Sequence, residues 1–241
     1  MIRLIYFFGF IIVTLIGTIP ALRKNKKVKQ AKDSDGEKFD HALPKRWARS
    51  VVGQTGSSVH IEGQHHIPDG PVLLVANHEG DFDVPALLGH IDKPFGFISK
   101  VEMKKFPLVR DWMNYLDCLY INRQDRRDAV KLLRDGASLL KSGRSLLIFP
   151  EGTRSQGGEM KPFKSGGFRM AKEARVPIVP IAIKGSSDIF EKHNRRKLSP
   201  SQIYIYVLPP VEPEMFDSLD LKEAAELVRN QIDTVLKEKN K

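Results

Sequence analysis

Residues 71–83 read PVLLVANHEGDFD, an uninterrupted apolar run followed at once by a polar loop that contains a glycine. A short apolar run bounded by proline and turn residues predicts a strand covered on both faces, here over residues 71–76. Similar runs predict further strands at residues 59–62, 95–99, 116–122, 145–149, 178–183 and 203–208. Helical patterns separate these runs, so the chain predicts an α/β fold, with a single mixed-sheet domain flanked by helices.

Two stretches carry the clearest helical periodicity. Apolar residues recur at helical spacing from Ala129 to Leu140, ahead of Gly143, and again from Leu221 to Val235. Asp220 with Glu223 three residues later predicts a capping box at the start of the second helix. We interpret the apolar residues of both stretches as part of the hydrophobic core. A third amphipathic pattern, over residues 37–53, could dock either on the domain or on a membrane.

The N-terminus carries a continuous apolar segment. Residues 4–22 contain no charged side chain, and as a helix these 19 residues would extend roughly 28 Å, close to the bilayer hydrocarbon thickness of about 30 Å. Six basic residues follow within 23–32, so the positive-inside rule predicts that the rest of the chain is cytoplasmic. Two alternatives to a spanning helix stay open for this segment. It could be a cleaved signal peptide, or it could be a shallow anchor in one leaflet, since Pro20 would disturb its last turn.

These patterns predict three segments. Residues 1–22 form a membrane-anchoring or transmembrane helix, residues 23–56 a basic linker with the amphipathic helix, and residues 57–241 the folded domain. Most of the net charge of +10 lies in the first two segments, because residues 1–32 contain seven basic residues and no acidic residue. The rest of the chain then contains 32 basic and 29 acidic residues. A nucleic-acid partner would need a basic face on the folded body and is therefore not expected. The single cysteine, Cys118, excludes an intramolecular disulfide.

A histidine and an aspartate follow the first strand. Ligands of open α/β sheets bind beyond the carboxyl ends of the strands, where His78 and Asp83 would lie. On a continuous helix these two side chains would point about 140° apart, so they meet only if a turn at Gly80 intervenes. A histidine oriented by a carboxylate can act as a general base. The alternative is that Asp83 caps a helix and His78 is a loop residue.

Two further strand ends carry groups that suit an anion. The loop after residues 145–149 reads PEGTRS, and its glycine, hydroxyls and Arg154 are typical of a phosphate site. Lys164 and a pair of glycines precede a short predicted helix at residues 168–174, whose N-terminus would also favour an anion. Arg123 follows the strand predicted at 116–122. Solvated surface charges are the alternative for each.

Together, four segments resemble the glycerolipid acyltransferase family that includes the 1-acylglycerol-3-phosphate (lysophosphatidic acid) acyltransferases. These segments are NHEGDFD at 77–83, YINR at 120–123, FPEGTRS at 149–155 and VPIVP at 176–180. They occur in the family's order, and the resemblance spans roughly residues 70–185. The second segment departs from the family pattern, because Asp117 and Cys118 replace a glycine-containing start and Asn122 replaces an acid. This departure bears on acceptor preference.

The resemblance implies an O-acyltransferase at the cytoplasmic face of a membrane. His78, held by Asp83, would take the hydroxyl proton of lysophosphatidic acid, and the oxygen would attack the thioester of acyl-CoA or acyl carrier protein to give phosphatidic acid. No acyl-enzyme, metal or bound organic cofactor is implied. Lys100, similar to a basic residue that the family carries after its first motif, would stabilise the oxyanion; the alternative is that it is a surface lysine. The residues implied in placing the acceptor are Arg123, Glu151, Gly152, Thr153 and Arg154.

Other functions stay open at this point. Glycerol 3-phosphate or another lysophospholipid could be the acceptor at nearly the same residues. A membrane-bound phosphohydrolase could use His78, Asp81 and Asp83 as metal ligands, and a non-enzymatic binder of anionic lipids would use the basic linker and Arg154 without His78.

Overall fold

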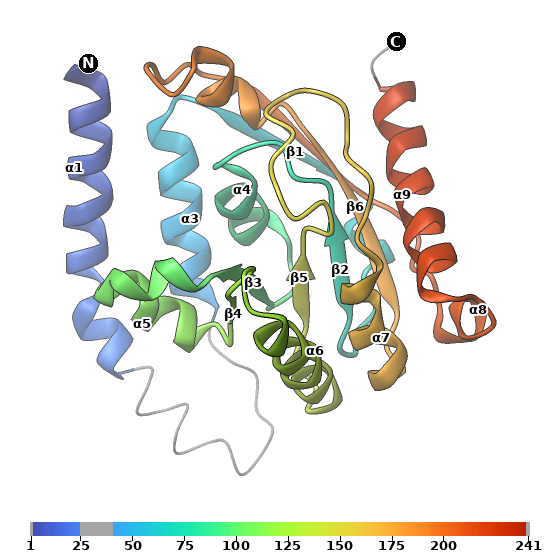
Figure 1. Ribbon diagram of the computed structural model, residues 1–241. Helices are drawn as coiled ribbons and strands as arrows, with labels where there is room; N and C mark the ends of the chain where they lie inside the picture. The colour runs from blue at the N-terminus through green and yellow to red at the C-terminus, as the bar shows by residue number, and fades with distance from the viewer. Residues whose placement is uncertain (1, 25–40, 240–241) are drawn as a thin grey trace.

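One seven-stranded sheet lies at the centre of the computed structural model, which describes residues 2–24 and 41–239 (Figure 1). All the predicted strands are present, and only their bounds differ. In chain order they are β1 (Ser58–Glu62), β2 (Leu73–Ala76), β3 (Gly96–Lys100), β4 (Leu119–Ile121), β5 (Leu146–Ile148), β6 (Ile178–Lys184) and β7 (Gln202–Val207).

The strand order across the sheet is β1-β7-β6-β2-β5-β3-β4. β2 lies between β5 and β6 and is parallel to both, and β3 and β4 continue the parallel set beyond β5. β7 runs antiparallel to β6, and β1 pairs with β7 in parallel. The mixed sheet is therefore confirmed, and the carboxyl ends of β6, β2, β5, β3 and β4 all lie at one edge.

Helices cover both faces of this sheet. Leu74 and Ala76 of β2 pack into a core cluster with α3 (Ala42–Gln54) and α4 (Asp83–His90). The alternate residues Leu73 and Val75 pack on the other face. The helices of that second layer are α6 (Arg126–Lys141), α7 (Phe168–Ala174), α8 (Pro213–Asp217) and α9 (Leu221–Glu238). Burial of both alternating sets explains why β2 is apolar throughout.

The predicted helices form where the periodicity indicated. α9 begins with the predicted capping box, because the Asp220 carboxylate accepts the Glu223 backbone N–H at 2.9 Å and the Glu223 side chain accepts the Asp220 N–H at 2.8 Å. α3 corresponds to the amphipathic pattern at 37–53, of which residues 37–40 lie outside the described residues. Val51 and Val52 are buried in the core cluster that includes α4, so α3 docks on the domain.

The strand predicted at 116–122 is shorter than expected. Leu116 follows α5 (Pro107–Tyr115), a helix that the sequence patterns did not indicate. Asp117 takes a left-handed conformation with φ 56°, and the Cys118 N–H donates to the Met113 carbonyl at 2.9 Å. This bond closes the helix end in the manner of a Schellman motif, so only Leu119–Ile121 remain free to pair with β3.

The N-terminal segment is a helix that lies along the domain. Residues Ile2–Lys24 are long and apolar enough to cross a membrane by length and composition, and their regular first part is α1 (Ile2–Gly17). Phe7, Leu15 and Leu22 are buried against the domain, whereas large apolar side chains on the other side are exposed. Figure 1 shows α1 beside α3 and α5, which it contacts. The predicted basic linker falls mostly on residues 25–40, outside the described residues.

Candidate active site

The two loops singled out by the sequence meet at the carboxyl edge of the sheet. β2 and β5 are adjacent and parallel, so the loops that begin at Asn77 and Phe149 leave the sheet side by side. Ser155 donates its backbone N–H to the His78 carbonyl at 2.8 Å, and Gln156 donates to the Glu79 carbonyl at 2.9 Å. The two loops are thus joined by backbone hydrogen bonds.

His78 and Asp83 are in direct contact. The His78 Nδ1 lies 2.5 Å from Asp83 Oδ2, with the Asp83 side chain fully buried and the His78 side chain 15% exposed. The imidazole stacks on the Phe149 ring at 4.1 Å between centroids and 19° between planes. Because Asp83 engages Nδ1, Nε2 is the nitrogen that can accept a proton from a substrate. The expected turn is present, since the Asp83 N–H bonds to the Gly80 carbonyl as α4 begins.

The backbone of this turn is held from several sides. Asn77 bridges to β6, because its side-chain amide donates to the Ile183 carbonyl at 2.9 Å and accepts the Ile183 N–H at 2.8 Å. Glu191 accepts the Asp81 N–H at 2.8 Å, and burial raises the pKa of this glutamate. A Cβ atom at Gly80 would lie 2.6 Å from Glu191 Oε2, so a larger residue here would displace the Glu191 carboxylate from its present position.

Glu151 lies inside the site, where it supports the loops. Its Oε1 accepts the His78 backbone N–H at 2.6 Å and its Oε2 accepts the Lys161 N–H at 2.9 Å. The side chain is buried, and this burial raises the pKa of its carboxyl, against the lowering effect of the two N–H donors. The role in acceptor binding that the resemblance implies stays a prediction. In the structure Glu151 joins His78 to the loop after β5.

Arg154 lies over the same edge, half-buried. Its Nη2 is 2.7 Å from Asp81 Oδ1, and the other carboxylate oxygen of Asp81 is 3.2 Å from Arg195. The Nε of Arg154 is buried and has no hydrogen-bond partner among the described residues. Gly152 takes φ 70° beside the Lys164 ammonium, and the Thr153 side chain is exposed. This loop therefore presents a guanidinium, a hydroxyl and an ammonium near His78, which is the donor set that binds phosphate.

Lys100 and Arg123 lie at the same edge but further along it. Lys100 ends β3 and Arg123 follows β4, so both belong to the parallel set and both are exposed. At a spacing of about 4.8 Å per strand, β3 is about 10 Å from β2 and β4 is about 14 Å from it. The Lys100 side chain must therefore extend across β5 to approach His78, and Arg123 is the most distant of the predicted residues.

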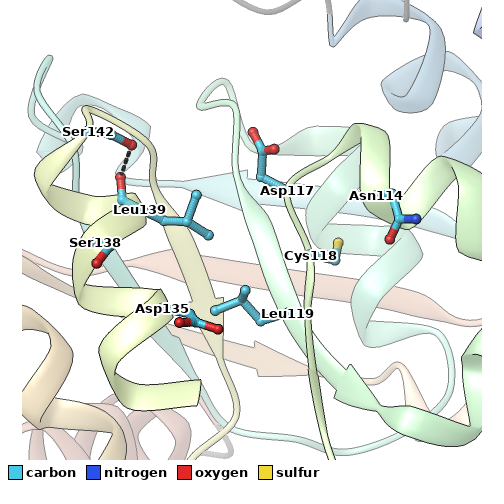
Figure 2. A pocket seen from close by; sticks show the side chains of 8 residues that line it. All are labelled: Asn114, Asp117, Cys118, Leu119, Asp135, Ser138, Leu139 and Ser142. Atoms are coloured by element: carbon cyan, nitrogen blue, oxygen red, sulfur yellow. Dashed lines mark hydrogen bonds between the residues drawn. The ribbon is translucent and has the colours of Figure 1, made fainter. Parts of the chain in front are cut away.

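A cavity of about 550 Å³ lies elsewhere in the molecule (Figure 2). It is lined by Asn114, Asp117, Cys118, Leu119, Asp135, Ser138, Leu139 and Ser142. These residues come from the end of α5, the start of β4 and the last turns of α6. They lie at the amino edge of the parallel strands, whereas His78 and Arg154 follow the carboxyl ends. This cavity is therefore separate from the candidate active site.

The sequence patterns gave no role to several residues of the site, among them Ser186, Glu79, Glu191 and Arg195. Ser186 follows β6, and its hydroxyl donates a hydrogen bond to Asp83 Oδ1. Glu79, next to His78, accepts the Ser186 backbone N–H at 3.1 Å. The run Gly185-Ser186-Ser187 is polar and follows an apolar strand, so the rule that pointed to His78 could have pointed to it as well.

Comparisons with known proteins identify the family of this chain. The Acyltransferase family model matches residues 58–184. A 1-acyl-sn-glycerol-3-phosphate acyltransferase of Chlamydomonas reinhardtii is 39% identical over 157 residues, which are 63% of this chain and 47% of the algal protein. The alpha 1-acyl-sn-glycerol-3-phosphate acyltransferase of Homo sapiens is 35% identical over 190 residues, which are 76% of this chain and 65% of the human protein. This chain thus spans about half to two thirds of these relatives.

A solved structure extends the likeness to the whole chain. The crystal structure of the 1-acyl-sn-glycerophosphate (LPA) acyltransferase PlsC from Thermotoga maritima matches with a TM-score of 0.72 and 27% sequence identity. The match covers 98% of this chain and 89% of that chain, and so includes the N-terminal helix. The family model, the named relatives and the shared fold together establish that this chain belongs to the acyltransferase family, the family of the 1-acyl-sn-glycerol-3-phosphate acyltransferases.

Proposed function

We propose that the protein is a 1-acylglycerol-3-phosphate O-acyltransferase, which transfers a fatty acyl group from acyl-CoA or acyl carrier protein to lysophosphatidic acid and forms phosphatidic acid. The observation that carries this proposal is the His78–Asp83 contact of 2.5 Å beside the arginine-bearing loop after β5. A base that is oriented by a buried carboxylate lies next to groups suited to a phosphate. A lysophosphatidic acid molecule carries both the hydroxyl and the phosphate that such a site needs.

The reaction begins with proton transfer. His78 Nε2 takes the proton from the free hydroxyl of the acceptor while Asp83 stabilises the imidazolium that forms. The alkoxide oxygen attacks the thioester carbonyl and makes a tetrahedral oxyanion. When the carbon–sulfur bond breaks, the thiolate takes the proton from Nε2, so the products are the ester and a free thiol. No covalent enzyme intermediate is needed, and His78 ends the cycle neutral.

The remaining predicted residues would bind charge. Arg154 can contact the acceptor phosphate by exchanging part of its contact with Asp81, and Gly152 lets the backbone approach the ligand closely. Lys100 would stabilise the oxyanion by extending across β5. Arg123, about three strands from His78, would add positive charge at the end of the site nearest β4.

We propose further that α1 lies in one leaflet of the membrane. It contacts the domain at both ends, because Arg3 donates to the Thr55 carbonyl at 2.8 Å and Trp47 donates to the Thr14 hydroxyl at 3.1 Å. Its other face exposes Ile5, Ile12 and other large apolar side chains. A helix docked in this way is held beside the domain, so the lipid acceptor can reach the site from the leaflet. The basic residues after Leu22 favour the anionic cytoplasmic leaflet, where the acyl donor is available.

The rival functions make different use of the same residues. A phosphohydrolase needs Asp81 and Asp83 free to bind a metal, but Asp81 contacts Arg154 and Arg195, and Asp83 contacts His78 and Ser186. Within residues 2–24 and 41–239, no group of three His, Cys, Asp or Glu side chains could hold a metal ion. A simple lipid binder has no use for an oriented imidazole. The acyltransferase proposal accounts for both the buried carboxylate and the cationic loop.

Acyl transfer by the purified protein in detergent tests this proposal. Labelled acyl-CoA and acyl carrier protein are offered with lysophosphatidic acid, glycerol 3-phosphate and lysophospholipids with other headgroups, with His78→Ala alongside. We expect phosphatidic acid from lysophosphatidic acid with the wild type alone. A preference for another acceptor would reassign Arg154 and the loop after β5. Consumption of neither donor would contradict the proposal, and equal binding of anionic vesicles by wild type and His78→Ala would then favour the lipid binder.

The position of α1 is tested by vesicle flotation. Ile12→Glu places a charge on the exposed face, so we expect weaker binding to anionic vesicles at unchanged thermal stability. Val130→Glu is the matched control, because Val130 is an exposed apolar residue on α6, away from α1. Equal loss of binding in both variants would contradict a specific membrane contact of α1.

A further inference from the structure

Ser186 occupies a position behind the His78–Asp83 pair. Its side chain is fully buried, and its hydroxyl donates to Asp83 Oδ1. The other carboxylate oxygen, Oδ2, receives His78 Nδ1 at 2.5 Å and the Gly80 backbone N–H at 3.0 Å. The carboxylate is thus held at both oxygens. The terminal torsion of an aspartate side chain varies widely, so the carboxylate plane is not fixed by the side chain itself. A hydrogen bond to Oδ1 fixes that plane, and with it the direction from which Oδ2 contacts the imidazole.

Glu79 holds the serine in turn. Its Oε2 accepts the Ser186 backbone N–H at 3.1 Å and lies 3.4 Å from the Ser186 hydroxyl oxygen. Because Glu79 is the residue after His78 and Ser186 follows β6, this contact ties the catalytic loop to the neighbouring strand. The residues Glu79, Ser186, Asp83 and His78 form one connected chain of contacts. We call the first two the Glu79–Ser186 support.

We propose that Ser186 is a positioning residue for proton transfer by His78, acting through the Asp83 carboxylate, and that Glu79 keeps Ser186 in place. This inference rests on the proposed acyl transfer for its catalytic readout. Ser186 does not touch the substrate. Its hydroxyl stabilises and orients the Asp83 carboxylate, and this carboxylate orients the His78 imidazole.

The charges around the Glu79–Ser186 support determine in which direction each substitution changes proton binding by His78. Burial, and then the negative charge of Asp83, raise the pKa of Glu79 to about 7, against the lowering effect of the backbone N–H groups of residues 185–187. Other ionisable groups of these loops include His78, Glu151, Lys161 and Lys164, the cluster of Asp81, Arg154, Glu191 and Arg195, and the pair of Asp188 and Lys192. Glu79 therefore ionises as the pH rises through about 7, and its carboxylate then adds a negative charge near Asp83.

The direct test is Ser186→Ala against Ser187→Ala. Both serines are buried neighbours in one loop, but the Ser186 hydroxyl is the one that bonds to Asp83. We expect Ser186→Ala to lower kcat about tenfold with the acceptor KM changed by less than about twofold. Ser187→Ala should keep kcat within about twofold of the wild type. Equal losses in the two variants would overturn the proposal, since they would reflect packing of the loop alone.

The pH dependence separates positioning from a loss of stability. Without the Ser186 hydroxyl, the Asp83 charge is less stabilised and holds the imidazolium more tightly, so the acid limb of kcat/KM should move to higher pH. Glu79→Gln removes a nearby negative charge and should move the same limb to lower pH. A loosened fold does not produce two shifts of opposite sign. Unmoved limbs in both variants would overturn the proposal.

A readout that needs no turnover separates this inference from the proposed function. Nuclear magnetic resonance titration of the His78 ring in the full-length protein should show the same two opposite shifts. If the wild type transfers no acyl group, the proposed function fails, and the titration still decides whether Ser186 and Glu79 act on His78. If the wild type is active and the titrations of Ser186→Ala and wild type coincide, the positioning role fails while the acyltransferase assignment stands.

Discussion

The two halves of the site differ in how tightly they are held. On the side of the base, the Asp83 carboxylate is fully buried and accepts hydrogen bonds from Gly80 and Ser186, while Glu151 accepts the His78 backbone N–H. On the side of the anion, Arg154 is half-exposed in an ion cluster with Asp81, and Lys100 and Arg123 are exposed. Proton transfer requires one geometry to within a fraction of an ångström, whereas long-range attraction of a phosphate tolerates mobile charges. The difference indicates a fixed chemical centre beside an adjustable recognition surface.

Removal of the base should have the largest effect. His78→Ala should lower kcat by about 100-fold to 10,000-fold, because general-base catalysis is lost while the acceptor phosphate still binds. Steady-state acyl transfer measures this change. His60→Ala is the control, since His60 is exposed on β1 and stacks on Tyr204, away from the site. A wild-type kcat in His78→Ala would contradict the role of His78 as the general base, and with it the distinction between the two halves of the site.

Removal of the guanidinium should affect recognition more than chemistry. Arg154→Ala should raise the KM for lysophosphatidic acid about tenfold or more with a smaller change in kcat, because a charge-assisted contact to the phosphate is lost. The same variant should discriminate less against acceptors without a phosphate. Arg169→Ala removes an exposed arginine that pairs with Glu173 on α7 and serves as the control. A fall in kcat alone would place Arg154 with the fixed half of the site.

Glu151 tests whether the two halves are joined. In Glu151→Gln the amide oxygen can accept the N–H of His78 or of Lys161, and the amide nitrogen then faces the other donor. We expect a loss of about 1–3 kcal/mol in unfolding free energy, with kcat reduced and KM for the acceptor raised together. Chemical denaturation and kinetics measure both. Glu159→Gln, an exposed neighbour, should leave both unchanged, and a KM effect without loss of stability would instead support direct acceptor binding by Glu151.

Glu79 should have the smallest effect on turnover, and its substitution should be visible mainly in the pH dependence of stability. Its folded-state pKa of about 7 lies above the ordinary value of 4.5, so the folded protein binds an extra proton between these two values. The wild type should therefore lose stability as pH rises from about 4.5 through 7, relative to Glu79→Gln. Thermal unfolding of the two proteins from pH 4 to 8 gives the comparison. Parallel curves across this window would show that burial of Glu79 does not perturb its ionisation.

Much of the fold follows from local patterns. The local patterns predict every strand and the helices α3, α6, α7 and α9, because strand and helix periodicities arise from backbone geometry over a few residues. The His78–Asp83 pair was also predictable, since five residues with a glycine between them can close one turn. The strand predicted at 116–122 was partly wrong, because the left-handed Asp117 that ends α5 leaves no periodic signal.

Sequence alone therefore determined the elements, the residue types of the site and the apolar character of the N-terminus. The tertiary structure decided what those residues contact. The strand order places β5 on one side of β2 and β6 on the other, which brings Glu151 and Ser186 to the His78 loop from positions 73 and 103 residues away from their partners. The tertiary structure also packs α1 against α3 and α5. These contacts depend on how both faces of the sheet are packed, and no local spacing records that packing.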